Sequence, residues 1–396
     1  MKQVKLQMVK PVLGSQYFLY FGVMGMVLPY FNLYCYHIGF SGFQIGTLSS
    51  LRSLVVVVLA LAWGTVADRF QIRKPVYILC NFASATVWAL YLLTDDFYLM
   101  LMITLLYSVF YGPIISFLEA YTMDALEQEK KSYGSVRVWG SVSFVLTVVI
   151  VGKLIDVYSA RIILWLILAG ALLQAMIALK IPGHLPSADP KPCRSFRVFT
   201  KKRVVVFLCS AFLMLVSHGT YYGFFSIHLE NLGFGSTFIG MSWAVASIAE
   251  IVVMMNSTWL FRKYSLEKVL MGSFAGAAVR WMLLAVSTSA GVIVFSQLLH
   301  AVTFAAFHVA SILYIDRLSP RENKTFGQAV NNSVTYGLGM AVGFLLNGML
   351  FERIGAVLLF GVSSGIALCA GLLFGCFRLA RFRRWQRMSV KNRARG

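Results

Sequence analysis

The chain is divided into twelve stretches of mainly apolar residues, separated by short polar segments. A helix needs about 20 apolar residues to cross the hydrocarbon layer of a membrane. The stretches lie near residues 13–36, 42–67, 76–93, 97–125, 136–158, 161–181, 203–230, 237–261, 267–287, 290–316, 324–350 and 354–377. Backbone polar groups in lipid must pair within their own segment, and no stretch alternates as a barrel strand does. We therefore expect an all-α membrane protein with twelve transmembrane helices.

The composition and the placement of positive charge agree with a membrane location. Of 396 residues, 59% are hydrophobic and 13% are charged, and the mean hydropathy is +0.75. A net charge of +20 would suggest nucleic-acid binding in a soluble protein, but 29 of the 35 lysines and arginines fall on one side of the predicted membrane. Positive residues concentrate on the cytoplasmic side. We expect a multi-pass protein of the cell inner membrane with both termini in the cytoplasm, which contacts lipid and no nucleic acid.

The chain repeats itself around a polar segment. Residues 182–203 hold four of the nine prolines and follow the sixth apolar stretch, which indicates a linker between two halves. An Ile-Gly-Phe turn at residues 38–40 returns 194 residues later as Leu-Gly-Phe at 232–234. Two parallel repeats of six helices, with a substrate site between them, are one known plan of transporters. The predicted domains are a six-helix bundle at 1–181, a cytoplasmic linker at 182–202, a second bundle at 203–377 and a basic cytoplasmic tail at 378–396.

Five charged residues lie inside apolar stretches. They are Arg52, Glu119, Arg137, Glu250 and Arg280. A charge in hydrocarbon is costly unless it is paired or faces water, so charge inside a membrane indicates a functional site. These residues predict a polar pathway through the membrane.

The turn after the second apolar stretch reads Gly64-Thr-Val-Ala-Asp68-Arg69. It resembles the G-x-x-x-D-R-x-G-R-K loop of the major facilitator superfamily, although Gln71 replaces the second glycine and the basic pair follows one place late. The resemblance implies that Gly64, Asp68 and Arg69 form a latch between cytoplasmic helix ends in one state of the transport cycle. The alternative is that these charges only orient the helices in the membrane.

A closer resemblance covers the fourth and fifth stretches. Glu119 and Arg137 are 18 residues apart, and an aromatic residue, Phe144, follows seven residues after the arginine. This pattern is similar to that of the lactose permease and its phenylpropionate-permease-like relatives, proton symporters in which such a pair orients the substrate. The resemblance implies that Glu119, Arg137 and Phe144 bind substrate. The alternative for Glu119 and Arg137 is an ion pair at the helix ends whose charges reach toward the membrane surface.

The second half continues the resemblance. Glu250, Arg280 and His300 fall where this branch keeps a carboxylate, an arginine and a histidine, which implies a proton-coupling site. A lysine and a carboxylate that flank the histidine in the lactose permease are replaced here by Gln297 and Thr303. Glu250 is then the deepest remaining acid, and we expect it to carry the proton and to pair with Arg280. His300 is expected to relay the proton, since imidazole titrates near neutral pH, or else to join helices.

Two further polar positions complete the predicted site. Arg52 lies about ten residues into its stretch, too deep to reach the membrane surface easily. Arginine presents a planar fork of donors that suits a carboxylate or adjacent hydroxyls. Asn331 is expected either to touch the substrate or to bridge helices. We count Arg52 and Asn331 with the predicted substrate-binding residues.

The sequence as a whole predicts a secondary active transporter and not an enzyme. We expect a proton-coupled symporter of a small organic solute, either an aromatic carboxylic acid such as phenylpropionate or a sugar such as a galactoside. Arginines outnumber carboxylates inside the membrane by three to two, which favours an anion. The alternatives are a membrane sensor or receptor, an exporter on the same fold, and an intramembrane enzyme, although the chain has no cluster of catalytic residues. Partners are expected to be the solute, protons and lipid, without a cofactor or metal, and the protein is expected to be a monomer.

Overall fold

The computed structural model describes residues 2–126, 133–181, 200–320 and 324–393, and the regular elements in these ranges are helices. The first half contains α1 (Lys2–His37), α2 (Gly42–Arg69), α3 (Arg73–Ala89), η1 (Leu90–Leu92), α4 (Phe97–Ala125), α5 (Tyr133–Val157) and α6 (Ile162–Ala178). The second half contains α7 (Lys202–Asn231), α8 (Ser236–Met255), α9 (Ser257–Lys263), α10 (Leu266–Val286), α11 (Ala290–Leu298), η4 (Ala301–Ala306), α12 (Phe307–Leu318), α13 (Lys324–Asn332), η6 (Ser333–Gly339) and α14 (Met340–Arg393).

These elements make twelve transmembrane helices. In the described part of the chain ten helical segments are long and apolar enough to cross a membrane, and the last of them extends from Phe326 to Leu379. That segment contains Gly355, whose φ of 71° and ψ of 167° break the helix into two spans. Helix α6 is shorter, with 17 residues, and supplies the remaining span. The predicted number of helices is confirmed, and the break at Gly355 falls at the start of the last apolar stretch of the sequence.

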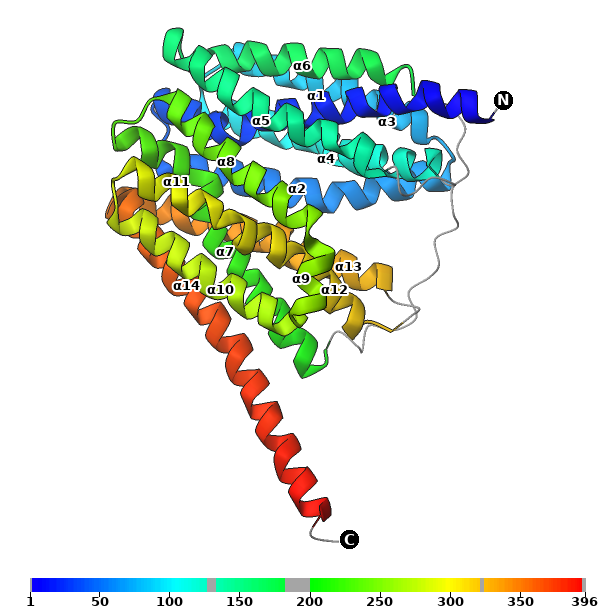
Figure 1. Cartoon of the computed structure of the whole chain (residues 1–396). Coiled ribbons are helices and arrows are strands. Elements are labelled where there is room, and N and C mark those ends of the chain that lie inside the picture. Colours follow the sequence, from blue (N-terminus) through cyan, green and yellow to red (C-terminus); the bar gives the residue numbers. More distant parts are fainter. Residues whose placement is uncertain (1, 127–132, 182–199, 321–323, 394–396) are drawn as a thin grey trace.

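The helices pack as two bundles of six. In the first half α1 packs against α5 and α6, while α4 packs against α2 and α3; in the second half α14 packs against α7 and α10. Figure 1 shows the first bundle above the second, with the end of α14 projecting away from both. The predicted all-α fold with two pseudo-symmetric six-helix bundles is confirmed. Residues 182–199 of the predicted linker and 394–396 of the predicted tail lie outside the described residues.

The repeated turn of the sequence is also a structural repeat. Gly39 after α1 has a φ of 89°, and Gly233 after α7 has a φ of 86°, values that favour glycine. In each turn the phenylalanine after the glycine donates its N–H five residues back, from Phe40 to Cys35 at 3.0 Å and from Phe234 to Leu229 at 3.1 Å. These hydrogen bonds end both helices in the same way. The two bundles therefore share this helix ending at equivalent positions.

The bundles meet along α2 with α14 and α5 with α8. They approach most closely at the membrane face that carries the Gly39 and Gly233 turns, which we call the closed end. A Cβ atom on Gly240 of α8 would lie 2.5 Å from the hydroxyl of Tyr30 in α1. That hydroxyl donates a hydrogen bond to the carbonyl of Val148 in α5 at 2.5 Å. Small residues let transmembrane helices approach in this way.

Two carboxylates join the bundles at the closed end. Asp156, at the end of α5, accepts hydrogen bonds from the backbone N–H groups of Ser236 at 2.6 Å and Thr237 at 2.8 Å, at the start of α8. Glu352 of α14 accepts one from the backbone N–H of Gly42, the first residue of α2, at 3.1 Å. Free N–H groups at a helix start attract negative charge. Each bundle thus caps a helix of the other.

Candidate functional site

A cavity of about 440 Å³ lies between the two bundles. Side chains from both halves of the chain line it: Tyr20, Phe21, Met24, Val27, Leu28, Ser49, Arg52, Ser53, Val56, Val57, Tyr107, Tyr111, Arg137, Ser141, Phe144, Leu215, Tyr222, Trp243, Ala246, Ser247, Glu250, His300, Phe304, Tyr336, Met340 and Phe344. Aromatic rings are frequent in this wall. Its charged side chains, among the described residues, are Arg52 and Arg137 in the first bundle and Glu250 in the second, with His300 beside Glu250.

Glu250, His300 and Arg280 form a chain that leads from the cavity into the second bundle. Nε2 of His300 lies 2.5 Å from Oε1 of Glu250, and Nδ1 of His300 lies 2.5 Å from Nη1 of Arg280. A guanidinium can only donate, so Nδ1 accepts from Arg280, and a neutral His300 carries its proton on Nε2, facing Glu250. The expectation of a direct Glu250–Arg280 ion pair is wrong, because the His300 ring lies between the two charges.

The three side chains differ in their exposure to solvent. The side chain of Glu250 is 21% exposed, that of His300 4%, and Arg280 is fully buried. The carboxylate is therefore the member of the chain that solvent or a solute in the cavity can reach.

Arg280 has acceptors that the sequence did not assign to it. Its Nη2 donates to Oε1 of Gln297 at 2.9 Å, and its Nη1 lies 3.3 Å from the hydroxyl of Thr303. The guanidinium also lies 4.3 Å from the ring centre of Tyr221. A buried guanidinium needs such partners, since burial without them is costly. Gln297 and Thr303, the two departures from the permease pattern, are thus part of the polar environment of Arg280.

The backbone changes its winding directly after His300. Residues Ala301–Ala306 form the π-helix η4, and Ser333–Gly339 form a second π-helix, η6, which presents Tyr336 to the cavity. Segments of π-helix are rare and occur frequently at functional sites. Tyr336 also places its hydroxyl 2.6 Å from Nδ1 of His308. Both π-helices lie in the second bundle, on the cavity side that carries Glu250.

Arg137 and Phe144 lie on α5, and both line the cavity. The guanidinium of Arg137 stacks on the Phe21 ring, 3.8 Å from its centre, and lies 5.5 Å from the centre of Tyr17. Such stacking is favourable for a cation. Glu119 is exposed on α4, lies outside the cavity lining and makes no ion pair with Arg137. The structure thus brings Arg137 and Phe144 to the cavity but not Glu119, whose role stays a prediction.

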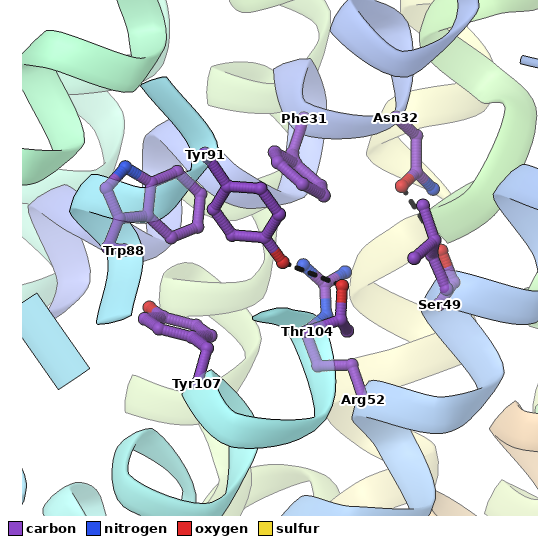
Figure 2. Close-up of a pocket in the computed structure, with 9 residues that line it drawn as sticks. Phe31, Asn32, Ser49, Arg52, Trp88, Tyr91, Thr104 and Tyr107 are labelled. Atoms are coloured by element: carbon purple, nitrogen blue, oxygen red, sulfur yellow. Dashed lines mark hydrogen bonds between the residues drawn. The ribbon is translucent and has the colours of Figure 1, made fainter. Parts of the chain in front are cut away.

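Arg52 lies at the junction of the large cavity with a second, small pocket. The small pocket, inside the first bundle, has a volume of about 10 Å³ and is lined by Phe31, Asn32, Leu48, Ser49, Arg52, Trp88, Tyr91, Thr104 and Tyr107. Figure 2 shows these side chains around the guanidinium of Arg52. Arg52, Ser49 and Tyr107 line both spaces.

The remaining predicted residues lie away from the cavity lining. Asn331 on α13 is fully buried, and neither its side-chain N nor its O has a hydrogen-bond partner among the described residues. Gly64, Asp68 and Arg69 lie in the last turns of α2, and the Arg69 guanidinium is 5.7 Å from the ring centre of Phe70. The side chain of Asp68 lies outside the described part of the chain, so the predicted latch stays a prediction. The described residues hold no group of three His, Cys, Asp or Glu that could bind a metal.

Comparison with known proteins gives the family. The model of the MFS_1 like family matches residues 12–362. The chain belongs to this family. The predicted membership of the major facilitator superfamily is thereby confirmed.

The known proteins that match the chain include transporters and permeases. The probable 3-phenylpropionic acid transporter of Escherichia coli (strain K12) is 27% identical over 87% of this chain and 91% of its own length. The maltose permease of Geobacillus stearothermophilus is 26% identical over 89% of this chain and 90% of its own length. The crystal structure of the nucleoside transporter NupG matches with a TM-score of 0.82 at 19% identity, over 93% of this chain and 98% of that chain, which shows the same fold. The protein is a membrane transporter of small solutes.

Several aromatic residues of the cavity were not singled out by the sequence. Tyr222, Trp243, Phe304 and Tyr336 line the wall around Glu250. Aromatic residues make up 14% of the chain, so nothing in the sequence separates these four from rings that face lipid. Phe304 does follow His300 by four residues, a spacing that places two side chains on one helix face.

Proposed function

We propose that the protein is a proton-coupled symporter of small aromatic carboxylates. The observation that carries the proposal is that the two sides of the cavity carry opposite charges. Glu250, held by His300, faces the cavity from the second bundle, whereas Arg52 and Arg137 face it from the first. Transporters of this architecture place their substrate between the two halves. A solute anion suits the first wall, and a proton suits the second.

The chemistry of the lining favours an aromatic acid over a sugar. Among the described lining residues there is no Asp, Asn, Gln or Lys. The lining is instead rich in rings, including Phe144, Tyr222 and Phe304. Rings pack against one another with a gain beyond the area they bury. The similarity to a probable 3-phenylpropionic acid transporter supports the same solute class.

Coupling is proposed to operate through Glu250. A carboxyl group in a poorly hydrated wall is more stable when neutral, whereas a nearby positive charge stabilises the carboxylate. Protonation of Glu250 removes the negative charge that holds His300 and, through it, Arg280. Rearrangement of this chain of three residues would then depend on whether the proton is bound, and a preference of each state for one cavity opening links the proton to transport.

We infer the orientation of the protein in the membrane from the distribution of its lysines and arginines. We place both termini in the cytoplasm and the closed end at the outer face of the cell inner membrane, because lysines and arginines concentrate at the other face. In this orientation the structure corresponds to a state that is closed toward the outside.

Uptake by purified protein in liposomes tests the proposal. Radiolabelled 3-phenylpropionate is offered with and without an imposed pH gradient, acid outside, and maltose and uridine are offered as alternative solutes. We expect 3-phenylpropionate to accumulate with the gradient faster than in protein-free liposomes, which the neutral acid enters by diffusion, and a protonophore to abolish the accumulation. Accumulation of maltose or uridine in place of 3-phenylpropionate would refute the solute class, and accumulation that ignores the gradient would refute the coupling.

A further inference from the structure

The guanidinium of Arg52 is a cation without a partner among the described residues. It is half-buried on α2, and no hydrogen bond, ion pair or ring contact engages it. The other two intramembrane arginines have contacts: Arg280 hydrogen-bonds to His300 and Gln297, although its Nε has no partner among the described residues, and Arg137 stacks on the Phe21 ring. A partly buried guanidinium is stabilised when its donors meet an acceptor, most of all a negatively charged one. Among these three arginines, Arg52 is the one that lacks a counterpart.

The polar groups nearest to Arg52 are occupied by one another. The hydroxyl of Tyr91 bonds to that of Thr104 at 2.7 Å, and Thr104 donates to the Met100 carbonyl at 2.7 Å. The hydroxyl of Ser49 donates to Oδ1 of Asn32 at 3.1 Å. Figure 2 shows both pairs of side chains beside the arginine. These groups make a polar surface around Arg52 but supply no negative charge to it.

We propose that Arg52 is the anchor for the carboxylate of the transported solute. The inference rests on the proposed function and assigns the anion to one of the two arginines in the cavity wall. A planar guanidinium can hold both oxygens of a carboxylate at once, which is the strongest common geometry for such a pair. The small pocket behind Arg52 has room for about one water molecule, so the body of the solute lies in the large cavity.

This anchor gives the solute a direction across the cavity. With its carboxylate on Arg52 of the first bundle, the ring of the solute extends toward Tyr222 and Phe304 of the second bundle. The anion and the proton are then bound by different bundles, at Arg52 and at Glu250. Ser49, which lines the same two pockets as Arg52, is linked to the opposite bundle, because Asn32 accepts from Ser49 and donates through Nδ2 to the Gly223 carbonyl of α7 at 3.1 Å.

The test compares a carboxylate with its matched amide. Purified wild type and variants are titrated with 3-phenylpropionate and with 3-phenylpropionamide, and binding is measured by isothermal titration calorimetry in detergent. The amide keeps the ring and the chain but lacks the charge, so the ratio of the two affinities reports the anion contact alone. For the wild type we expect a preference for the acid on the order of 10- to 100-fold, the range of a charge-assisted hydrogen bond.

Arg52→Gln should remove this preference, because the affinity for the acid falls while the affinity for the amide stays within about twofold of the wild type. Arg52→Lys should retain part of the preference for the acid. Arg262→Gln removes the same charge from an exposed position at the end of α9 and should keep the wild-type ratio. Retained amide binding shows that the variant is folded. If the affinities of the variant for the acid and for the amide fall by the same factor, Arg52 has a structural role and the inference is overturned.

The outcomes for the anchor and for the proposed function are distinct. If the wild type binds and transports 3-phenylpropionate and Arg52→Gln keeps the full preference for the acid, the anchor lies elsewhere and the proposed function stands. If the wild type neither binds nor transports aromatic carboxylates, the proposed solute class is wrong and the inference falls with it.

Discussion

The carboxylate of Asp156 accepts the backbone N–H of Ser236 at 2.6 Å across the boundary between the two bundles. Helix α8 begins after Gly235, which has no side chain to cap it, so Asp156 of α5 provides the cap. Glu352 likewise accepts the backbone N–H of Gly42. Gly42 is the residue of the first half that corresponds to Ser236, 194 residues earlier in the chain. The bonds exist only while the closed end is closed, because each joins one bundle to the other.

Asp156→Asn should open the closed end more often. Each negative charge at a helix start stabilises it by about 0.3–1 kcal/mol, so the population open to the outside should rise about two- to fivefold. The measurement is the rate at which a membrane-impermeant thiol reagent, added outside the cell, labels a cysteine placed by Ser141→Cys in the cavity wall. The matched control is Asp95→Asn, since Asp95 pairs with Arg161 within the first bundle. A labelling rate equal to that of the control would contradict the role of Asp156.

Glu352→Gln should act in the same direction as Asp156→Asn. The two carboxylates cap different helices and share no partner, so their effects should add in free energy and multiply in the labelling rate. The double variant is therefore expected to label faster than either single variant, in the same Ser141→Cys assay. A double variant no faster than Asp156→Asn would mean that one interface alone controls the closed end.

Glu250→Gln should separate exchange from accumulation. Glutamine resembles the protonated carboxyl group, so the cavity can still change sides with solute bound, but no proton can be released. We expect the variant in liposomes to exchange internal for external 3-phenylpropionate, and to show no accumulation under a pH gradient beyond that of protein-free liposomes.

Glu267→Gln is the control for the Glu250 experiment, because Glu267 pairs with Arg317 and Arg203 outside the cavity lining. It should accumulate the solute as the wild type does. Accumulation by Glu250→Gln would show that the proton binds elsewhere, and loss of exchange as well would make Glu250 a binding residue.

Arg137→Lys tests whether the second cationic residue of the cavity contacts the solute. Lysine keeps the charge but stacks less well on Phe21 and lacks the planar fork. Because the carboxylate is assigned to Arg52, we expect the affinities for 3-phenylpropionate and for its amide to fall together, by about two- to fivefold, as for the loss of one cation–π contact, while the amount of folded protein is unchanged. Arg161→Lys, at an exposed site, is the control. An unchanged affinity would leave Arg137 as a residue that only packs against α1.

The sequence by itself determined the helices and the repeat. The number of membrane spans and the matching turns at Gly39 and Gly233 depend on local properties, namely the length of an apolar stretch and the freedom of a glycine backbone. The sequence also singled out Glu250 and His300, since a polar side chain is conspicuous in an apolar stretch. Each of these features can be recognised within a window of about 20 residues, the length of one span.

Only the tertiary structure decided which side chains meet. The His300 ring separates Glu250 from Arg280, Glu119 lies outside the cavity lining, and Asp156 reaches α8 in the other bundle. These relations depend on how each helix is rotated about its axis and shifted along it. A rotation by one residue turns a helix by about 100°, enough to move a side chain from a cavity to lipid, without changing its apolar character. Packing between helices fixes that rotation, and it involves residues far apart in the chain.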